Sequence, residues 1–156
     1  RKTEFEDNVT PSGNSIAVLN LLRLAAILFD QEYAKRAQAV LKAAPDGIRL
    51  HPSGFPQLLM AVDYLLDQSK EIVVIAEKED AALSEVKGSL LRAFIPNKVA
   101  VVSVGSNNSV PLLKNKTAIQ GKPTLYVCVN RVCKLPTADL GKAMAMANDS
   151  KKFELP

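Results

Sequence analysis

The sequence contains no tryptophan, a single histidine, two cysteines and only 5% aromatic residues. Proteins that hold single-stranded nucleic acids commonly stack the bases on aromatic side chains, so this scarcity argues against that function. The net charge of +4 is modest, and the lysines and arginines are spread along the chain rather than clustered. We therefore expect no nucleic-acid partner.

Long apolar runs are also missing. A helix that crosses a bilayer needs about 20 consecutive apolar residues, and the nearest candidate, residues 19–29, is shorter and contains Asn20 and Arg23. The first residues do not have the pattern of a signal peptide. We expect no membrane partner, and the low cysteine content favours a reducing, cytoplasmic location.

The chain has no glycine-rich loop for binding phosphate. The apolar run 72–76 is followed by Glu77-Lys78-Glu79-Asp80, which places three carboxylates where a phosphate would need backbone N–H groups. Neither a GxGxxG motif nor a P-loop occurs. We therefore expect no nucleotide, and the sequence predicts no other cofactor.

The pattern of residues 1–69 predicts three helices joined by polar loops. Residues 16–29 are apolar at all but two positions, which favours a helix buried on nearly every side. Residues 31–44 have one apolar stripe behind Asp30, a candidate N-cap, and are typical of an amphipathic outer helix. Residues 57–67 are again apolar on several faces. The order buried, amphipathic, buried is expected of helical hairpins in an (α/α) toroid.

Two polar loops, residues 6–15 and 51–55, precede the two helices that we expect to be buried. Successive inner helices of a toroid run parallel, so both loops should lie on one rim, where helix N-termini favour polar or anionic ligands. Asp7 and His51 are the candidate catalytic residues, because carboxylates and histidine supply acids and bases for sugar chemistry. The candidate ligand-binding residues are Glu6, Ser12, Asn14 and Gln57.

Each rim residue also has a structural interpretation. Asp7, Ser12 and Asn14 are residue types that cap helix N-termini, and His51 can be a hydrogen-bonded turn residue. Glu6 and Asp7 are adjacent in sequence and would not naturally face each other across a substrate. For any single one of these residues we favour the structural interpretation.

From residue 70 onward the pattern predicts a small α/β unit with three strands. The runs 72–76 and 99–102 are rich in β-branched residues and suit strands buried on both faces. Between them, a segment with one apolar face follows Asp80, so a right-handed βαβ unit with parallel strands is predicted. The remaining predicted elements are a strand over 124–129 and a helix capped by Thr137. The fold class is therefore α+β, with toroid hairpins over 1–69 and the α/β unit over 70–156.

The two cysteines, Cys128 and Cys133, are the candidate redox residues. Their spacing differs from the CxxC of most redox pairs, and zinc lacks a full ligand set with one histidine in the chain. We expect buried free thiols first, a local disulfide or thiol switch second, and a metal site last.

Five stretches carry a joint pattern: Glu-Asp-Asn-Val-Thr-Pro-Ser-Gly-Asn-Ser at 6–15, Leu-Leu-Arg-Leu at 21–24, His-Pro-Ser-Gly-Phe-Pro-Gln-Leu-Leu at 51–59, Pro-Asn-Lys-Val at 96–99, and Gly-Lys-Pro-Thr-Leu-Tyr-Val-Cys at 121–128, continuing through Asn130 to Cys133. Together they resemble the spermatogenesis-associated protein 20 family, over nearly the whole chain. The resemblance implies a longer protein with an N-terminal thioredoxin-like domain, an (α/α)6 toroid similar to N-acylglucosamine 2-epimerases and six-hairpin glycosidases, and this chain as its C-terminal part.

Three functions compete under this resemblance. The toroid can bind or transform a carbohydrate, the segment can be a structural closing and docking module, or its cysteines can exchange with the thioredoxin-like domain. We favour the structural function for these residues alone and the enzymatic one for the longer protein. The expected partners are the remaining toroid helices and the thioredoxin-like domain, and the isolated segment should self-associate through its apolar helix flanks.

Overall fold

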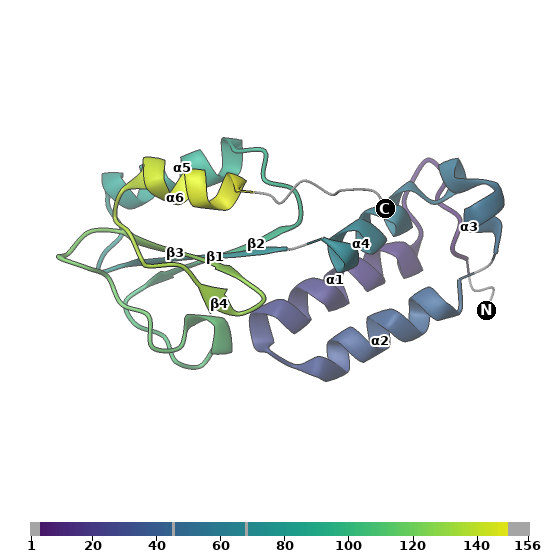
Figure 1. The fold of residues 1–156 in the computed structure, drawn as a ribbon, viewed down its shortest axis with the longest axis horizontal. Coiled ribbons are helices and arrows are strands. Elements are labelled where there is room, and N and C mark those ends of the chain that lie inside the picture. The colour runs from purple at the N-terminus through teal and green to yellow at the C-terminus, as the bar shows by residue number, and fades with distance from the viewer. Residues whose placement is uncertain (1–3, 45, 68, 150–156) are drawn as a thin grey trace. The chain divides into compact units, whose positions relative to one another are not determined.

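A computed structural model describes residues 4–44, 46–67 and 69–149. Its contacts divide the chain into two compact units, residues 1–67 and 68–156, and each unit is described by itself. The first unit contains helices only, and the second contains a mixed β-sheet covered by helices (Figure 1). Helices and a mixed sheet together give the α+β fold class expected from the sequence.

Three long helices build the first unit: α1 (Gly13–Leu28), α2 (Gln31–Lys42) and α4 (Pro56–Leu66). Helix α1 packs against both α2 and α4. The side chains it buries fall at steps of three and four residues, Ser15, Val18, Leu19, Leu22 and Ala25, as expected for a packed helix face. Asp30 caps α2 as predicted, accepting a 2.9 Å hydrogen bond from Glu32 N–H.

The connection between α2 and α4 is more ordered than the sequence predicted. It contains the four-residue helix α3 (Gly47–Leu50) and the short 3-10 helix η1 (Pro52–Gly54). Both lie in a stretch of glycine and proline that indicated only a helix stop and a loop. Such single turns depend on local hydrogen bonds, for example His51 N–H to Gly47 C=O at 2.7 Å, rather than on an apolar repeat.

The first and third long helices are less buried than predicted. Ile16 and Leu24 on α1 are 42% and 39% exposed, and Met60 and Leu66 on α4 are 56% and 70% exposed. Helix α1 therefore presents one face to its neighbours and leaves an apolar strip on the other side. Both helices carry apolar residues on several sides, but the other described residues bury only part of that apolar surface.

The second unit is built on four strands in the order β2-β1-β3-β4 (Figure 1). The strands are β1 (Lys70–Ala76), β2 (Lys98–Val104), β3 (Thr124–Val129) and β4 (Val132–Cys133). Strand β1 pairs with β2 in parallel, as predicted for the βαβ unit, and with β3 in antiparallel. The fourth strand, only two residues long, was not predicted.

Helices α5 (Ala81–Arg92) and α6 (Leu140–Asn148) cover one face of this sheet (Figure 1). They bury one set of alternating strand residues together with their own apolar side chains: Ile72, Val74, Ala76, Leu125, Val127, Leu83, Val86, Leu90, Ala143 and Ala147. Asp80 caps α5 as predicted, accepting from Leu83 N–H at 2.9 Å. The predicted cap of α6 was wrong: Asp139 caps it, and Thr137 instead forms a bridge to β3.

Alternate residues of β1 point to the opposite face of the sheet, and these include Glu71, Val73 and Ile75. The 3-10 helix η2 (Pro111–Leu113) contributes two buried leucines in the segment between β2 and β3. This second face carries the only buried carboxylate among the described residues, Glu71, which is 4% exposed.

Candidate functional site

The structure brings the two rim loops together through Asp7. Its Oδ1 accepts a 2.7 Å hydrogen bond from Ser12 N–H, and its Oδ2 accepts a 2.8 Å bond from Gln57 N–H. The Asp7 N–H in turn donates to the carbonyl of Gly54 at 2.7 Å. One carboxylate thus joins the starts of α1 and α4, where backbone N–H groups lack helical partners and favour negative charge.

Ser12 is the N-cap of α1. Its Oγ accepts a 3.1 Å hydrogen bond from Ser15 N–H and lies 2.7 Å from Ser15 Oγ, and both residues are buried. Ser15 Oγ donates onward to the carbonyl of Phe5 at 3.3 Å, which attaches the segment before the helix. This predicted ligand-binding residue therefore has its hydroxyl engaged in a cap.

Two further predicted ligand-binding residues also make structural contacts. Asn14 Nδ2 donates to the carbonyl of Glu4 at 2.6 Å, across the N-terminal segment. Gln57 contributes its backbone N–H to the Asp7 carboxylate. In both cases the recorded hydrogen bond holds a loop against a helix start.

Glu6 and His51 lie at the exposed side of the same rim, against Gly54. A Cβ added at Gly54 would come within 2.9 Å of His51 Cδ2 and 3.0 Å of Glu6 Oε1. The glycine therefore leaves room for both the carboxylate and the imidazole to pack against its backbone. The His51 ring also has the Ser53 hydroxyl 3.4 Å from Nδ1.

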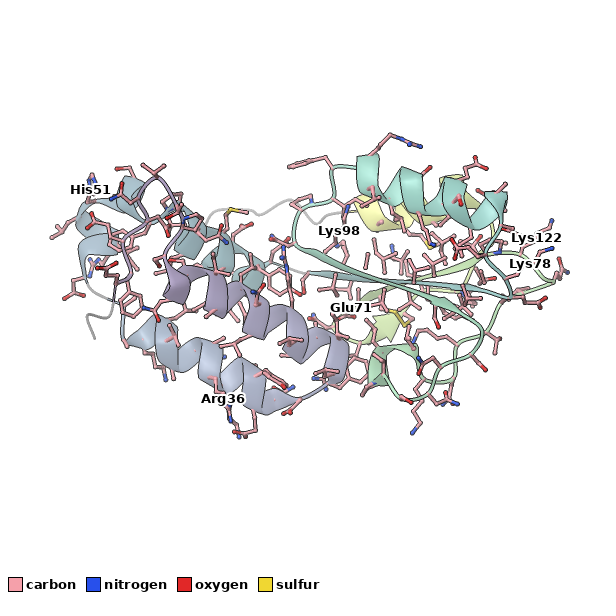
Figure 2. All side chains as sticks on the ribbon, turned by 180° about the vertical axis from the view of Figure 1, so that it is seen from behind. Arg36, His51, Glu71, Lys78, Lys98 and Lys122 are labelled. Carbon is pink, nitrogen blue, oxygen red and sulfur yellow. A yellow bond between two sulfur atoms is a disulfide. The ribbon has the colours of Figure 1, made fainter. Side chains whose placement is uncertain are left out.

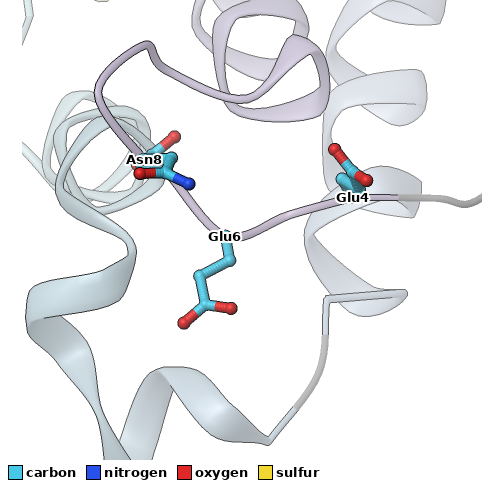
Figure 3. A pocket seen from close by; sticks show the side chains of 4 residues that line it. Glu4, Glu6 and Asn8 are labelled. Carbon is cyan, nitrogen blue, oxygen red and sulfur yellow. The ribbon is translucent and has the colours of Figure 1, made fainter.

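A shallow hollow of about 630 Å³ opens beside this segment, lined by Glu4, Glu6, Asp7 and Asn8. Figure 3 shows Glu4, Glu6 and Asn8 along one stretch of chain, with the Glu6 carboxylate extended away from it. A lining rich in oxygen atoms suits hydroxyl groups, because carboxylate oxygens accept the hydrogen bonds that hydroxyl groups donate. The sequence prediction missed Glu4, Asn8 and Gly54, although Asn8 and Gly54 lie in the same two loops and Glu4 lies just before the first of them.

Cys128 and Cys133 form a disulfide, so the expectation of free thiols was wrong. They are directly opposite in the antiparallel pair of β3 and β4, with Cα atoms 3.8 Å apart. The connecting turn has positive φ at both Asn130 and Arg131, as in a type I′ hairpin turn. A tight hairpin therefore holds the two sulfur atoms together.

Glu71 was not predicted as a functional residue, yet it lies beside this hairpin (Figure 2). It is the cross-strand partner of Cys128, and its Oε2 accepts a 3.0 Å hydrogen bond from Arg131 N–H. Burial raises the pKa of Glu71, and the Arg131 N–H and the charges of Arg131 and Lys116 act in the opposite direction. Burial likewise lowers the pKa of Lys116, which lies 5.7 Å from the centre of the Tyr126 ring.

Two negative observations limit the chemistry of the described residues. Within residues 4–44, 46–67 and 69–149, histidine, cysteine and carboxylate side chains do not gather in a group of three or more that could hold a metal ion. No helix in that part of the chain is long and apolar enough to cross a membrane.

The chain is thus an α+β protein with a helical unit tied at one rim by a bridging aspartate and a mixed-sheet unit that carries a disulfide hairpin. Human spermatogenesis-associated protein 20 is 26% identical over 144 residues, covering 89% of this chain and 18% of that protein. Its rat counterpart is 27% identical over 147 residues, with the same coverage, and an uncharacterised protein of Caenorhabditis elegans is 30% identical over 139 residues, covering 87% of this chain and 19% of that protein.

These similarities support membership of the spermatogenesis-associated protein 20 family. It spans less than a fifth of the length of these curated relatives. No protein-family model matches the chain, and no solved structure matches it either.

Proposed function

We propose that residues 1–69 are a structural closing module, the last helical hairpins of an (α/α) toroid in a longer protein, and that the α/β unit docks with the rest of that protein. The observation that carries this proposal is the double hydrogen bond of Asp7 to Ser12 N–H and Gln57 N–H. It supports parallel inner helices whose starts meet at one rim, as a toroid requires. The exposed apolar residues of α1 and α4 support a further layer of helices against them.

Asp7 and Ser12 then act as caps, and their substitution affects stability rather than binding. Alanine at Asp7 or Ser12 should lower the free energy of unfolding, because each cap contributes about 0.5–2 kcal/mol. Alanine at exposed Glu6 or His51, whose side chains make no capping hydrogen bond to a helix among the described residues, should leave stability nearly unchanged. Urea unfolding of the four variants measures this pattern, and equal losses at all four positions would contradict it.

A second candidate function is carbohydrate binding at the hollow beside Glu6. The observation that favours it is the approach of Glu6 and His51 over Gly54, next to an opening lined by carboxylates and an amide. In this function Glu6 accepts sugar hydroxyl groups and His51 carries a proton, while Asp7 holds the rim in place. Turnover of the sugar belongs to the longer protein.

A thermal-shift screen against neutral, N-acylated and phosphorylated sugars tests the second candidate. A ligand at about 100 times its dissociation constant stabilises the folded state by roughly 2.7 kcal/mol. Binding should be lost in Glu6→Gln and in His51→Ala. Gly54→Ala tests the arrangement of the two side chains, since it displaces both without removing either functional group. If no sugar in the panel raises the melting temperature, carbohydrate binding is contradicted and the structural function is retained.

A further inference from the structure

The disulfide joins one buried and one exposed cysteine. Cys128 is 0% exposed in β3, whereas Cys133 is exposed on β4, a strand of two residues at the end of the sheet order. A thiolate from solution therefore reaches the bond from the Cys133 side. Attack on the Cys133 sulfur breaks the bond and leaves Cys128 as a thiolate. Because Cys128 is buried, its negative charge is unfavourable until the sulfur is protonated.

A buried glutamic acid lies beside Cys128 in the sheet. Glu71 is directly opposite Cys128 in the register of β1 and β3, and paired side chains of this kind have Cβ atoms about 4.5–5.5 Å apart. Glu71 as a residue is 4% exposed, and its carboxyl group is held at the hairpin by Arg131 N–H. The charged side chains that face it are Lys116, from the segment between β2 and β3, and Arg131, from the hairpin turn.

We propose that the Cys128–Cys133 disulfide is a reversible redox site that exchanges with a dithiol, and that Glu71 carries the proton of the Cys128 sulfur. Nothing in this proposal depends on the function assigned to the helical unit. The chain itself supplies a disulfide whose Cys133 end is accessible and whose Cys128 end lies beside the Glu71 carboxyl group.

The reaction balances in two steps. A thiolate of the dithiol attacks Cys133 Sγ, the S–S bond breaks, and Cys128 leaves with the electron pair and takes a proton from the neutral Glu71 carboxyl. The second thiolate of the dithiol then attacks the dithiol sulfur that is bonded to Cys133 in the mixed disulfide. This releases the Cys133 thiolate, which is protonated from water. The dithiol is oxidised by two electrons, the protein disulfide is reduced by two, and Glu71 regains its proton from water. In the oxidising direction Glu71 accepts the proton of Cys128.

The raised pKa of Glu71 fits this task. Burial keeps the carboxyl group protonated to a higher pH than an exposed glutamic acid, so the neutral donor form persists over a wider range of pH. Lys116 and Arg131 oppose the shift by favouring the ionised form, which assists the return of a proton in the oxidising direction.

The first test asks which of the two sulfur atoms is accessible to thiol–disulfide exchange. Single-cysteine variants of the 156-residue chain, Cys128→Ser and Cys133→Ser, are reacted with glutathione disulfide, and the mixed disulfide is followed by intact mass. Cys133 should react on the order of a hundredfold faster than Cys128, because only Cys133 is exposed. Equal rates after unfolding in urea are the control. Equal rates in the folded proteins, or a faster Cys128, would overturn the proposed direction of attack.

The second test isolates the proton carrier. The disulfide of the wild type and of Glu71→Gln is reduced with dithiothreitol across a pH series, and each rate is divided by the thiolate concentration. Glutamine can still accept from Arg131 N–H, so the hairpin contact is retained. The wild-type rate per thiolate should fall as pH rises and Glu71 loses its proton, and the variant should be at least about tenfold slower at acidic pH with a flat profile.

Glu77→Gln is the matched control, since Glu77 is an exposed carboxylate immediately after the same strand. It should follow the wild-type profile. Identical profiles in wild type and Glu71→Gln would overturn the role of Glu71, and so would a variant that is faster at every pH, which indicates a loosened hairpin. A folded wild-type chain that dithiothreitol reduces only after unfolding would overturn the redox site itself.

Discussion

Asp7 and Gln57 are separated by 50 positions in the sequence, yet Asp7 Oδ2 accepts a 2.8 Å hydrogen bond from Gln57 N–H. The other oxygen of the same carboxylate accepts from Ser12 N–H, so one side chain serves both N–H groups. This bridge fixes which ends of α1 and α4 lie together. The rim of the helical unit is therefore organised by a side chain that also lines its hollow.

Replacement of Ser12 tests the cap of α1. Ser12→Ala removes the acceptor of Ser15 N–H and the contact with Ser15 Oγ, both buried, and should lower the free energy of unfolding by about 1 kcal/mol. Thr10→Ala, at an exposed position in the same loop, is the control and should change little. The measurement is the midpoint and slope of urea unfolding. A Ser12 variant as stable as the control would contradict the assigned cap.

Glu71 gives the stability of the protein a defined pH dependence. Its pKa is raised in the folded state above 4.5, so between 4.5 and the raised value the folded chain binds more protons than the unfolded chain. The free energy of unfolding should therefore fall as pH rises through that window. In Glu71→Gln this contribution should disappear, whereas Glu77→Gln should retain it. Urea unfolding at a series of pH values measures the difference, and parallel wild-type and Glu71→Gln curves would argue against it.

Reduction of the disulfide should leave the fold intact. Cys128 and Cys133 are five positions apart, and closing so short a loop constrains the unfolded chain by only about 2 kcal/mol. We expect the reduced chain to keep its circular dichroism spectrum and to melt at a moderately lower temperature. The pair Cys128→Ser and Cys133→Ser combined in one chain should match the reduced wild type. Complete unfolding on reduction would mean that the bond is a structural staple.

The exposed apolar strip of α4 should drive self-association of the isolated chain. Met60 and Leu66 are 56% and 70% exposed, and such residues normally meet a partner surface. Sedimentation at tens of micromolar should give a mass above that of the monomer. Leu66→Lys should shift it toward the monomer, whereas Leu91→Lys, at an 85% exposed position on α5, should not. A wild type that sediments as a monomer would contradict this expectation.

Apolar periodicity was sufficient to predict most elements of the fold. The three long helices, the parallel pair of β1 and β2, and strand β3 each have a repeat that fits one secondary structure. The caps Ser12, Asp30 and Asp80 were also recognisable, since each short polar residue stands directly before an apolar repeat. Local sequence therefore determined these parts.

The missed features depend on contacts between distant segments. The predicted strand began at Ile72 and left out Lys70 and Glu71, but Glu71 belongs to β1 and is buried against a hairpin 60 positions away. Strand β4 has two residues and a turn without glycine, so neither a repeat nor a turn motif indicated it, and the local disulfide was ranked behind free thiols. Glu6 and His51 likewise pack against Gly54 because that residue has no side chain.

The most direct test of this account is the unfolding free energy of Asp7→Ala beside that of Glu6→Ala. The two carboxylates are adjacent in sequence and line the same hollow, but only Asp7 accepts the N–H groups at the starts of α1 and α4. Asp7→Ala should lose about 2 kcal/mol, since two caps are removed together, and Glu6→Ala should lose almost nothing. Equal stability of the two variants would contradict the claim that Asp7 joins the helices at this rim.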